Sequence, residues 1–362
     1  MIQILHKDFR LNGQKFNSVE ELLTCVERLP NEVQDFLIDW FSNSKSIVVK
    51  TSGSTGSPKL ISVKKKHMIS SAKATGQFFN LHSQTSVLHC LPTQFVAGKM
   101  MWVRAFVLGW HIDLIEPSGS PLENIHKIYD FTAMTALQAA NSLKKIEHIN
   151  KLLIGGGSVS DSLRVDFNKV KTLVFLSYGM TETVSHVAIE PINQAAVNFF
   201  KDNNYHFKKD EFTLLPDVFI STDDRSCLVI DAKKITDKSL VTNDIVQITS
   251  INTFKWLGRI DHVINSGGIK LIPESIELKL SKFIHQPYFI SSLPDDKLGD
   301  RLILFVEGKV NFDSMDLTSV LGKTELPKEI ISIPHFTYTP TGKINRQITK
   351  AEYMEQKKSS PM

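Results

Sequence analysis

A segment rich in glycine, serine and threonine, TSGSTGSPK, directly follows a short β-branched run. Its glycines allow backbone N–H groups to converge on an anion, and its hydroxyls can donate to phosphate oxygens. It is not a Walker loop, because its lysine follows proline and no serine or threonine comes next to hold magnesium. A flexible linker is the alternative interpretation. The residues expected to contact phosphate are Thr51, Ser52, Gly53, Ser54, Thr55, Gly56 and Lys59.

Further motifs follow this segment in a fixed order. They are Gly155–Gly157, the sequence YGMTE at Tyr178–Glu182, Asn243–Asp244 in place of a Gly-Asp pair, GRID at Gly258–Asp261, SGG at Ser266–Gly268, PESIE at Pro273–Glu277 and PTGKINR at Pro340–Arg346. From about residue 47 to residue 346 the chain therefore resembles the adenylate-forming superfamily of acyl-CoA ligases, luciferases and peptide-synthetase adenylation domains.

The resemblance implies a nucleotide site. The glycine turn would leave a surface without side chains for adenine, although a tight turn between strand and helix is the alternative. Tyr178 would stack on the base. Asp244 would accept both ribose hydroxyls and Arg259 would donate to the same ribose, whereas either alone is more often a surface charge. The expected nucleotide residues beyond the first loop are Gly155, Gly156, Gly157, Tyr178, Gly179, Asp244 and Arg259.

The resemblance also implies a reaction in two steps. A carboxylate attacks the α-phosphorus of ATP and releases pyrophosphate, and the acyl-adenylate then passes its acyl group to the thiol of coenzyme A. Lys343 would bridge the carboxylate and the phosphate, and Thr181 would donate to the α-phosphate. Glu182 would reach Mg²⁺ on the triphosphate, since this cation prefers oxygen ligands; a solvated glutamate at a helix start is the alternative.

Both steps cannot use one geometry, because Lys343 occupies the face that the thiol needs. We therefore expect a nucleotide- and acid-binding domain at 1–260, shortened at its amino end relative to the family, and a small mobile α+β domain at 261–362 that carries Lys343. Asp261 stands at the family's hinge position, although a loop aspartate that caps the next turn is the alternative. Gly267 and Gly268 would approach the nucleotide site and leave room for a pantetheine arm.

Choice of the acid is expected to reside in Leu91–Ala105, LPTQFVAGKMMWVRA, which is similar to the LPxxHxxG…(K/R) segment of o-succinylbenzoate:CoA ligases of menaquinone biosynthesis. Arg104 lies in an apolar helix and would be the counter-charge for a second carboxylate; an ion pair with a surface acid is the alternative. No aspartate occurs here to hold an amino-acid ammonium group, which disfavours amino-acid activation. The expected acid-binding residues are Gln94, Phe95 in place of the family's histidine, Gly98 and Arg104.

The elements that carry these motifs predict an α/β fold. A capping box at Ser18 opens a helix to about Arg28, and a second helix covers Asn31–Phe41. Strands and helices then alternate as layers. Expected strands are Ile47–Val49, Ser86–Leu91, His111–Ile115, Lys151–Ile154 and Thr172–Leu176. Expected helices are His67–Phe79, Ala97–Leu108, Leu122–Tyr129 and Leu163–Phe167. A β-rich subdomain follows, with strands at Thr213–Leu215, Val218–Ser221, Cys227–Ile230 and Asp244–Thr249.

Composition narrows the class of protein. The 362 residues carry 42 Lys+Arg against 38 Asp+Glu, a net charge of +4, and three separated cysteines, which favours a reducing, cytoplasmic compartment. No signal peptide or membrane span is expected. The basic run Lys64–His67 is expected to be a solvated face rather than a nucleic-acid site. Another acyl- or aryl-CoA ligase, or a nucleotide-binding homologue without catalysis, stays an alternative, and the oligomeric state is open.

Overall fold

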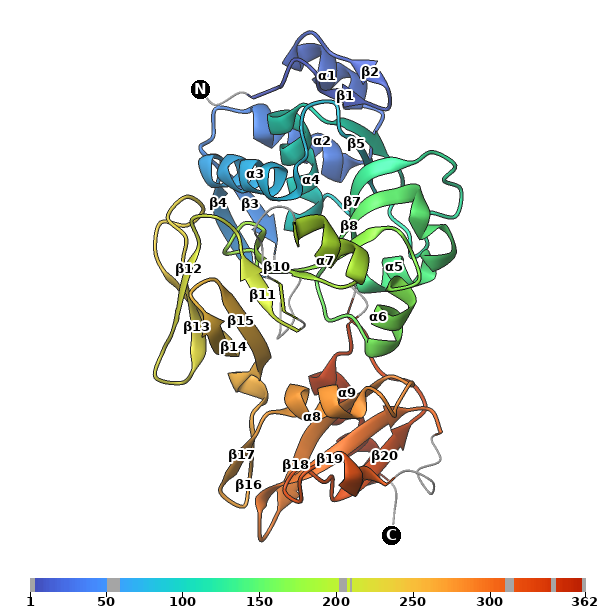
Figure 1. Cartoon of the computed structure of the whole chain (residues 1–362), viewed down its shortest axis with the longest axis vertical. Helices are drawn as coiled ribbons and strands as arrows, with labels where there is room; N and C mark the ends of the chain where they lie inside the picture. Colours follow the sequence, from blue (N-terminus) through green and yellow to red (C-terminus); the bar gives the residue numbers. More distant parts are fainter. Residues whose placement is uncertain are drawn as a thin grey trace.

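A computed structural model describes residues 4–50, 59–201, 207–208, 210–309, 316–339 and 343–359 of the chain. In these residues, thirteen strands form one large sheet in the order β12-β13-β14-β15-β11-β10-β9-β8-β7-β5-β6-β1-β2, and five strands form a second sheet. In Figure 1 the large sheet and its helices form the upper part of the molecule, and the second sheet forms the lower part. A short connection joins the two parts. The predicted α/β fold is confirmed.

The central part of the large sheet is parallel. Its strands are β5 (Ser86–His89), β6 (His111–Leu114), β7 (Tyr129–Thr135), β8 (Ile149–Gly155) and β9 (Leu173–Gly179). The helical elements between or beside them are α3 (Lys65–Phe79), α4 (Val96–Leu108), α5 (Ala136–Asn141), η1 (Leu143–His148), α6 (Asp161–Phe167) and α7 (Gln194–Lys201). Strands covered on both faces are apolar along their length, as in the buried run Leu152–Ile154. Because β8 and β9 are parallel neighbours, their carboxyl ends lie at the same edge of the sheet. Parallel sheets bind ligands at this edge.

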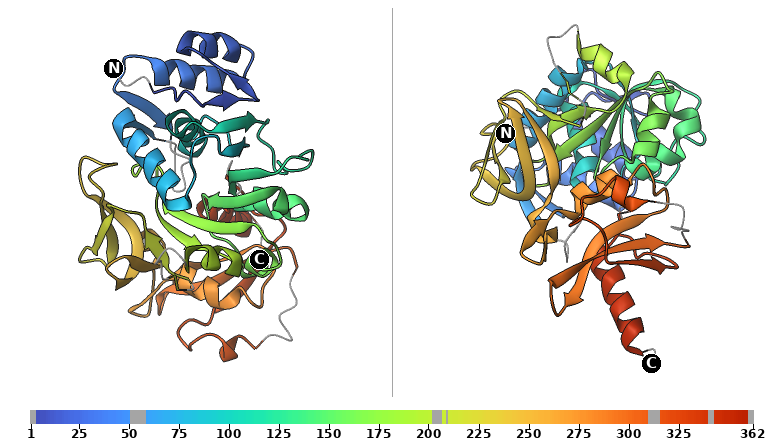
Figure 2. Two further views of the ribbon diagram at one scale, coloured as in Figure 1. Left: turned by 45° about the horizontal axis from the view of Figure 1, so that its top comes forward. Right: turned by 60° about the horizontal axis from the view of Figure 1, so that its bottom comes forward.

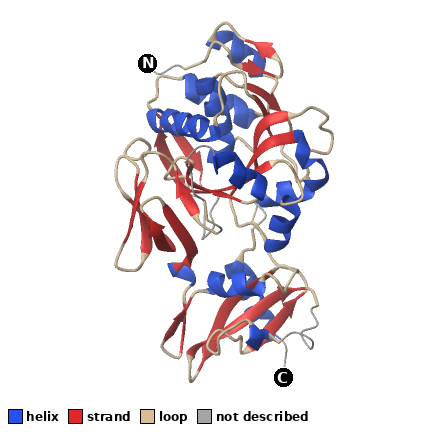
Figure 3. Cartoon of the chain, in the orientation of Figure 1, coloured by secondary structure: helices blue, strands red, loops and turns tan. Residues whose placement is uncertain are grey.

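An antiparallel part completes the large sheet. Its strands are β10 (His186–Pro191), β11 (Phe212–Leu214), β12 (Phe219–Thr222), β13 (Cys227–Asp231), β14 (Leu240–Ser250) and β15 (Thr253–Arg259). The predicted change to a β-rich, antiparallel pattern after residue 198 is confirmed, although β14 is longer than expected. Figure 3 shows these strands as a group with few helices, beside the mixed helices and strands of the parallel part.

Two helices near the amino end, at the top of Figure 1, extend the part of the molecule that contains the large sheet. This region contains β1 (Arg10–Leu11), β2 (Gln14–Lys15), α1 (Val19–Val26), α2 (Asn31–Phe41) and the paired strands β3 (Ser46–Lys50) and β4 (Leu60–Lys64). Ser18 caps α1 by accepting from the N–H of Glu21, as the sequence predicts. The buried ring of Trp40 on α2 lies 6.4 Å from that of Phe106 on α4. This contact packs α2 against α4.

Two predictions made from the sequence are wrong. The segment Leu122–Tyr129 is not a helix: a single turn carries buried Leu122, and the chain then enters β7 at Tyr129. The spacing of Leu122, Ile125 and Ile128 resembles a helical face, but Ile128 is exposed, and so short a helix lacks the packing that would stabilise it. The basic run is not one solvated face either, because Lys65 is buried and donates to the carbonyl of Ser42, while Lys64 pairs with Asp237 at 2.6 Å.

The second sheet forms the carboxyl-terminal part. It comprises η2 (Ile260–His262), β16 (Ile264–Ser266), β17 (Ile269–Leu271), α8 (Pro273–Leu280), β18 (Tyr288–Asp295), β19 (Gly299–Glu307), η3 (Leu317–Ser319), β20 (Glu329–Ile333) and α9 (Arg346–Ser359). Ile276 of α8 packs on one face of the sheet, and Tyr353 of α9 packs near Phe305 on the other. The right-hand view of Figure 2 shows α9 running outward to the carboxyl end. The domain boundary at residue 260 stays a prediction; in the described chain the large sheet ends at Arg259.

No helix in the described ranges combines the length and the apolar character that crossing a membrane requires. The three cysteines, all of them described, are free.

Candidate active site

The glycine turn after β8 and the lysine near the carboxyl end lie side by side. Gly156 has a φ of +83°, which glycine adopts without strain. A Cβ placed on Gly157 would lie 3.8 Å from Cε of Lys343. The structure thus brings together two predicted site elements that lie far apart in the sequence.

A short hairpin stem holds Lys343. Tyr338 and Ile344 pair across it, the N–H of Thr339 donates to the carbonyl of Lys343 at 2.8 Å, and the N–H of Lys343 donates to the hydroxyl of Thr339 at 3.1 Å. Burial lowers the pKa of the Lys343 ammonium group, and the charge of Arg259 lowers it further. Within the described part of the chain, no acidic side chain forms an ion pair with Lys343. An ammonium group that has no acidic partner of its own among the described residues and lies near a second cation is suited to an anion.

Asp244 lies at the centre of a polar cluster on the antiparallel strands. Its Oδ2 accepts from the hydroxyl of Tyr178 at 2.6 Å, its Oδ1 accepts from Nε1 of Trp256 at 3.2 Å, and Nη1 of Arg259 lies 3.5 Å from Oδ1. Burial and the Asp244 carboxylate raise the pKa of Tyr178, so its hydroxyl stays a donor. The sequence motifs do not include Trp256; the register of β14 with β15, which pairs Val246 with Trp256, places it here.

Besides the hydrogen bond of its hydroxyl, Tyr178 packs its ring against two phenylalanines. It meets Phe254 edge-on, with centroids 5.2 Å apart, and Phe212 at 5.6 Å. These contacts fix the ring at the end of β9, beside the glycine turn. Stacking of this ring on adenine stays a prediction.

The turn that follows Tyr178 is strained and tightly bonded. Gly179 is required here, because a Cβ would come 2.3 Å from the carbonyl oxygen of Ser185. Buried Thr183 accepts from the N–H of Met180 at 2.9 Å and donates to the same Ser185 carbonyl at 2.7 Å. Val184 has a φ of +67°, an outlier for a β-branched residue of the kind found at functional sites. The sequence analysis missed Thr183 and Val184, although both lie within three residues of the predicted motif.

This turn carries Thr181, predicted to donate to the α-phosphate, and Glu182, predicted to reach Mg²⁺. Thr181 is half-buried and Glu182 is exposed. No cluster of three or more potential metal-ligating side chains occurs in the residues that the structure describes. An exposed carboxylate beside an anion site nevertheless fits Mg²⁺, which commonly uses one or two carboxylates together with substrate phosphates and water.

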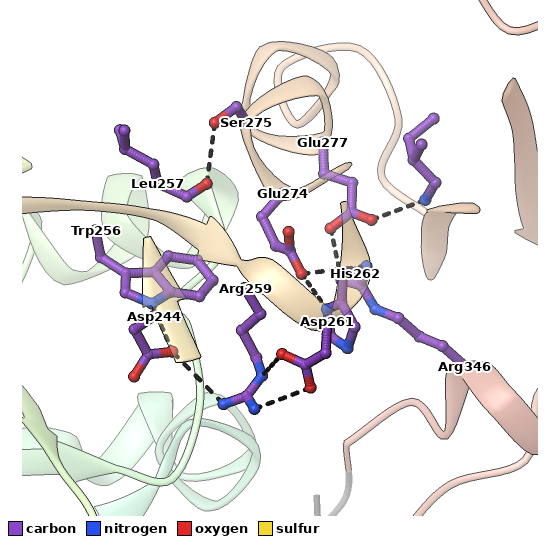
Figure 4. Close-up of polar contacts among 11 residues, drawn as sticks. Asp244, Trp256, Leu257, Arg259, Asp261, His262, Glu274, Ser275, Glu277 and Arg346 are labelled. Carbon is purple, nitrogen blue, oxygen red and sulfur yellow. Dashed lines mark hydrogen bonds and ion pairs between the residues drawn. The ribbon is translucent and has the colours of Figure 1, made fainter. Parts of the chain in front are cut away.

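A chain of charged contacts continues from this site into the connection between the sheets. Figure 4 shows Arg259 between Asp244 and the predicted hinge residue Asp261. Although burial acts to raise the pKa of Asp261, the Arg259 guanidinium holds it below its usual value. His262 contacts Glu274 of α8, and Nη2 of Arg346 donates to Oε2 of Glu277 at 2.7 Å. The residue three positions after Lys343 is thereby anchored to α8.

The two predicted pantetheine glycines lie elsewhere. Gly267 and Gly268 form the turn between β16 and β17, both with positive φ, and Gly267 donates its N–H to the carbonyl of Leu298 at 2.8 Å. Figure 1 shows this hairpin extending away from the large sheet. In this arrangement they are not beside the glycine turn, so their predicted approach requires a second arrangement.

Arg104 is buried on α4, with 2% of its surface exposed. Its Nη2 donates to the Ser185 hydroxyl at 2.7 Å and its Nε to the Thr75 hydroxyl at 3.2 Å, and burial lowers its pKa to about 9. The alternative of an ion pair with a surface acid is wrong for the described chain, where the polar partners of Arg104 are hydroxyls and the sulfur of Met101. Arg104 is a buried cation beside the YGMTE turn.

The other predicted acid-binding residues lie apart from Arg104. Gln94 is exposed and Phe95 caps the amino end of α4. Phe95 and Arg104 are nine positions apart along α4, which corresponds to about 13 Å along the helix axis. Gly98 packs against the loop before the helix, where a Cβ would come 2.2 Å from the carbonyl oxygen of Pro92. A single carboxylate group therefore cannot contact both Phe95 and Arg104.

Thr93, which the motifs did not single out, holds the start of this segment. Its N–H donates to Oε1 of Glu32 on α2 at 2.8 Å, and its carbonyl accepts from Nζ of Lys99 at 2.9 Å. Its hydroxyl accepts from Nε1 of Trp102 at 3.1 Å and contacts the ring of His89. The amino-terminal helix α2 thus supports the loop that precedes α4.

The first predicted phosphate loop cannot be placed. Thr51, Ser52, Gly53, Ser54, Thr55 and Gly56 lie outside the described residues. Its last member, Lys59, is exposed and directly precedes β4.

Comparison with known proteins agrees with this geometry. A family model described as AMP-binding enzyme matches residues 42–198. A crystal structure from Dyadobacter fermentans, of an acyl-CoA synthetase (AMP-forming)/AMP-acid ligase II-like protein, is 33% identical, with a TM-score of 0.57, and the match covers 89% of this chain and 93% of that one.

Two other relatives carry more specific names. A 2-succinylbenzoate–CoA ligase of Listeria monocytogenes is 24% identical over 88% of this chain and 72% of its own length. An o-succinylbenzoate coenzyme A synthetase from Bacillus subtilis, solved with ATP and magnesium ion, shares the fold with a TM-score of 0.71 at 17% identity, over 94% of this chain and 83% of that one. The chain belongs to the family of AMP-binding, adenylate-forming enzymes that includes the AMP-forming acyl-CoA synthetases.

Proposed function

We propose that the protein converts o-succinylbenzoate into o-succinylbenzoyl-CoA with consumption of ATP, through an acyl-adenylate. One observation carries the choice of acid: Arg104 is a buried cation that contacts hydroxyls and a sulfur but no carboxylate in the described chain. A buried charge is costly unless it is paired. A dicarboxylic acid would pair it with one carboxylate while the other is activated. The name of the Listeria relative supports the same acid.

In the first step a carboxylate oxygen attacks the α-phosphorus of ATP, and the bond to the pyrophosphate oxygen breaks. Lys343 would lie between the carboxylate and the α-phosphate, because its ammonium group is held at the glycine turn without an acidic partner among the described residues. Thr181 would donate to the same phosphate. Such prearranged positive charge stabilises the negative charge that accumulates during transfer.

Glu182 would hold Mg²⁺ together with the phosphate oxygens of ATP. The ion would supply charge neutralisation on the triphosphate when bound. Asp244 and Arg259 would hold the ribose: the Asp244 carboxylate already accepts from Tyr178 and Trp256, and its remaining lone pairs are free for hydroxyl donors. Lys59 and the rest of the Thr51–Lys59 segment would hold the pyrophosphate.

In the second step the thiol of CoA attacks the acyl carbon, and AMP leaves with the bridging oxygen. We propose that the part after residue 260 swings about Asp261 to remove Lys343 and bring Gly267 and Gly268 to the site. Two features support this movement. The β16–β17 hairpin points away from the glycine turn when Lys343 is near it, and the link between the sheets is a single short turn, η2.

The test is a panel of acids assayed by pyrophosphate release and by detection of the CoA thioester. The panel contains o-succinylbenzoate and two analogues in which one or the other carboxylate is replaced by a carboxamide. We expect thioester from the diacid, little from either amide, and a KM for the diacid about a hundredfold higher in Arg104→Met. Faster turnover of an unrelated monocarboxylic acid would show that the enzyme is a different acyl- or aryl-CoA ligase. No pyrophosphate with any acid would favour a non-catalytic nucleotide-binding protein.

A further inference from the structure

Four side chains from three separate elements, Arg104 among them, form a closed ring of contacts. Nε of Arg104 donates to Oγ1 of Thr75 on α3 at 3.2 Å, and Nη2 donates to Oγ of Ser185 at 2.7 Å. The imidazole of His186, the first residue of β10, completes the ring: its Nε2 lies 3.3 Å from the Thr75 hydroxyl and its Nδ1 lies 3.3 Å from the Ser185 hydroxyl. Thr75 is fully buried, and His186 is 5% exposed.

With a neutral imidazole at His186, one arrangement of protons satisfies every contact of this ring. The Thr75 hydroxyl also lies 3.0 Å from the carbonyl oxygen of Ser71 and donates to it. Its oxygen then accepts from Arg104 and from Nε2–H of His186. Nδ1 of His186 therefore carries no proton and accepts from the Ser185 hydroxyl, whose oxygen accepts from Arg104. The opposite tautomer of His186 would leave the contact from Thr75 to Ser71 unmade.

The surroundings of His186 keep its imidazole neutral. Burial, and next the charge of Arg104, keep the pKa of His186 well below its usual value. The imidazole can therefore contact both hydroxyls without adding a second positive charge beside the guanidinium. His186 also lines a cavity of about 360 Å³ between α3 and the segments 215–218 and 232–235, whose lining does not include Arg104.

The ring of contacts uses only some of the hydrogen-bond donors of the Arg104 guanidinium. Of the five N–H groups of arginine, one on Nε and one on Nη2 donate to oxygen. Nη1 has only the sulfur of Met101, at 3.7 Å, as a polar contact in the described part of the chain. Nη1 and the second hydrogen of Nη2 make up the paired donors that bind a carboxylate through two parallel hydrogen bonds.

We propose that Thr75, Ser185 and His186 are positioning residues that hold Arg104 with its Nη1–Nη2 edge turned to the second carboxylate of the acid. This inference rests on the proposed function, because it concerns the same cation and the same acid. The ring explains why the cation is specific: it fixes the guanidinium in one orientation and supplies no negative charge that would compete with the substrate. The three residues thereby determine the preference for a diacid over a monoacid.

The first experiment compares Thr75→Val, which removes the hydroxyl at nearly constant volume, with Thr75→Ser, which keeps it. We expect Thr75→Val to raise the KM for the diacid about tenfold to a hundredfold, while the KM for ATP changes by less than about threefold. The ratio of kcat/KM for the diacid to that for its better monocarboxamide should fall by a similar factor. Thr75→Ser should restore both quantities. A purely structural role of Thr75 would alter the KM values for acid and ATP together.

Parallel variants separate the possible outcomes. In one outcome, Arg104→Met loses the diacid preference while Thr75→Val and Ser185→Ala keep it. That result overturns the positioning role of the ring and leaves the proposed function intact. Unchanged preference in Arg104→Met overturns both. If Thr75→Val does not fold, Ser185→Ala, which removes the other hydroxyl, is judged by the same ratio.

A spectroscopic measurement tests the ring without kinetics. In protein labelled with ¹⁵N-histidine, His186 should show the neutral Nε2–H tautomer at pH 7, assigned by its loss in His186→Gln. The Nδ1–H tautomer, or a protonated imidazole, would contradict the assignment of protons. His186→Gln should itself retain most diacid preference, because an amide offers one donor and one acceptor.

Discussion

Arg259 donates to both oxygens of Asp261, through Nε at 3.1 Å and through Nη2 at 3.0 Å. Its third nitrogen, Nη1, faces Asp244 at 3.5 Å. A single guanidinium therefore joins the carboxylate predicted to hold ribose to the residue predicted to act as the hinge. Binding of a nucleotide at Asp244 would act on the same side chain that holds the connection between the two sheets.

Replacing Asp261 by proline should separate the two steps. Proline fixes φ near −65°, a value that a 3₁₀ turn such as η2 tolerates, but it prevents the rotation that a hinge requires. We expect pyrophosphate release to stay within about fivefold and thioester formation to fall at least tenfold, both measured in single-turnover assays. Asp261→Ala is the control, because it removes the same carboxylate and leaves φ free. Equal losses in both steps for Asp261→Pro would contradict the hinge.

Lys343→Ala should abolish adenylate formation and spare the fold. Removing one positioned charge of this kind costs about a hundredfold to a thousandfold in rate. Thioester formation from acyl-adenylate supplied in solution should persist, because that step does not use the lysine. Lys357→Ala, at an exposed position of the following helix α9, is the matched control. Full activity of Lys343→Ala would remove this residue from the site.

The rate of adenylate formation should fall at alkaline pH earlier than an ordinary lysine would allow. Burial and Arg259 lower the pKa of Lys343 below its usual 10.5, and the charged form, which is present below that pKa, is the active one. The activity is therefore kept at lower pH and lost as pH rises through the lowered pKa. In Arg259→Met, measured at saturating ATP, this alkaline limb should move to higher pH. A limb that stays in place would show that another group titrates.

Thr93→Val should destabilise the protein, since it leaves the buried Nε1–H of Trp102 without its acceptor. An unsatisfied buried donor costs about 1–3 kcal/mol in the free energy of unfolding. Denaturant titration measures the change, and Thr93→Ser, which keeps the hydroxyl, should recover most of it. Thr93→Val with wild-type stability would mean that Trp102 finds another partner.

The sequence allows the site to be located because its motifs follow strands. Gly155–Gly157 and Gly179–Glu182 end neighbouring parallel strands, so recognising β8 and β9 is enough to bring both to one edge of the sheet. Lys343 is identified by its motif alone, while its position beside Gly157 depends on how the two sheets are arranged, which periodicity does not encode.

Other parts of the site depend on tertiary contacts. Trp256 reaches Asp244 through the register of two antiparallel strands, and Thr75 reaches Arg104 because α3 packs on α4. Neither residue stands in a motif, and a threonine in the middle of a helix carries no local signal. The incorrect helix at Leu122–Tyr129 has the same origin, since pairing of β7 with β8 outweighs the local spacing of apolar residues.

Transfer of oxygen from the acid to AMP tests the central claim most directly. The acid, labelled with ¹⁸O in its carboxylates, is incubated with enzyme, ATP, Mg²⁺ and CoA, and the products are analysed by mass spectrometry. If the acid is activated as an acyl-adenylate, each AMP formed carries one ¹⁸O atom and the pyrophosphate carries none. Unlabelled AMP, or label in pyrophosphate or in inorganic phosphate, would contradict attack of the carboxylate on the α-phosphorus.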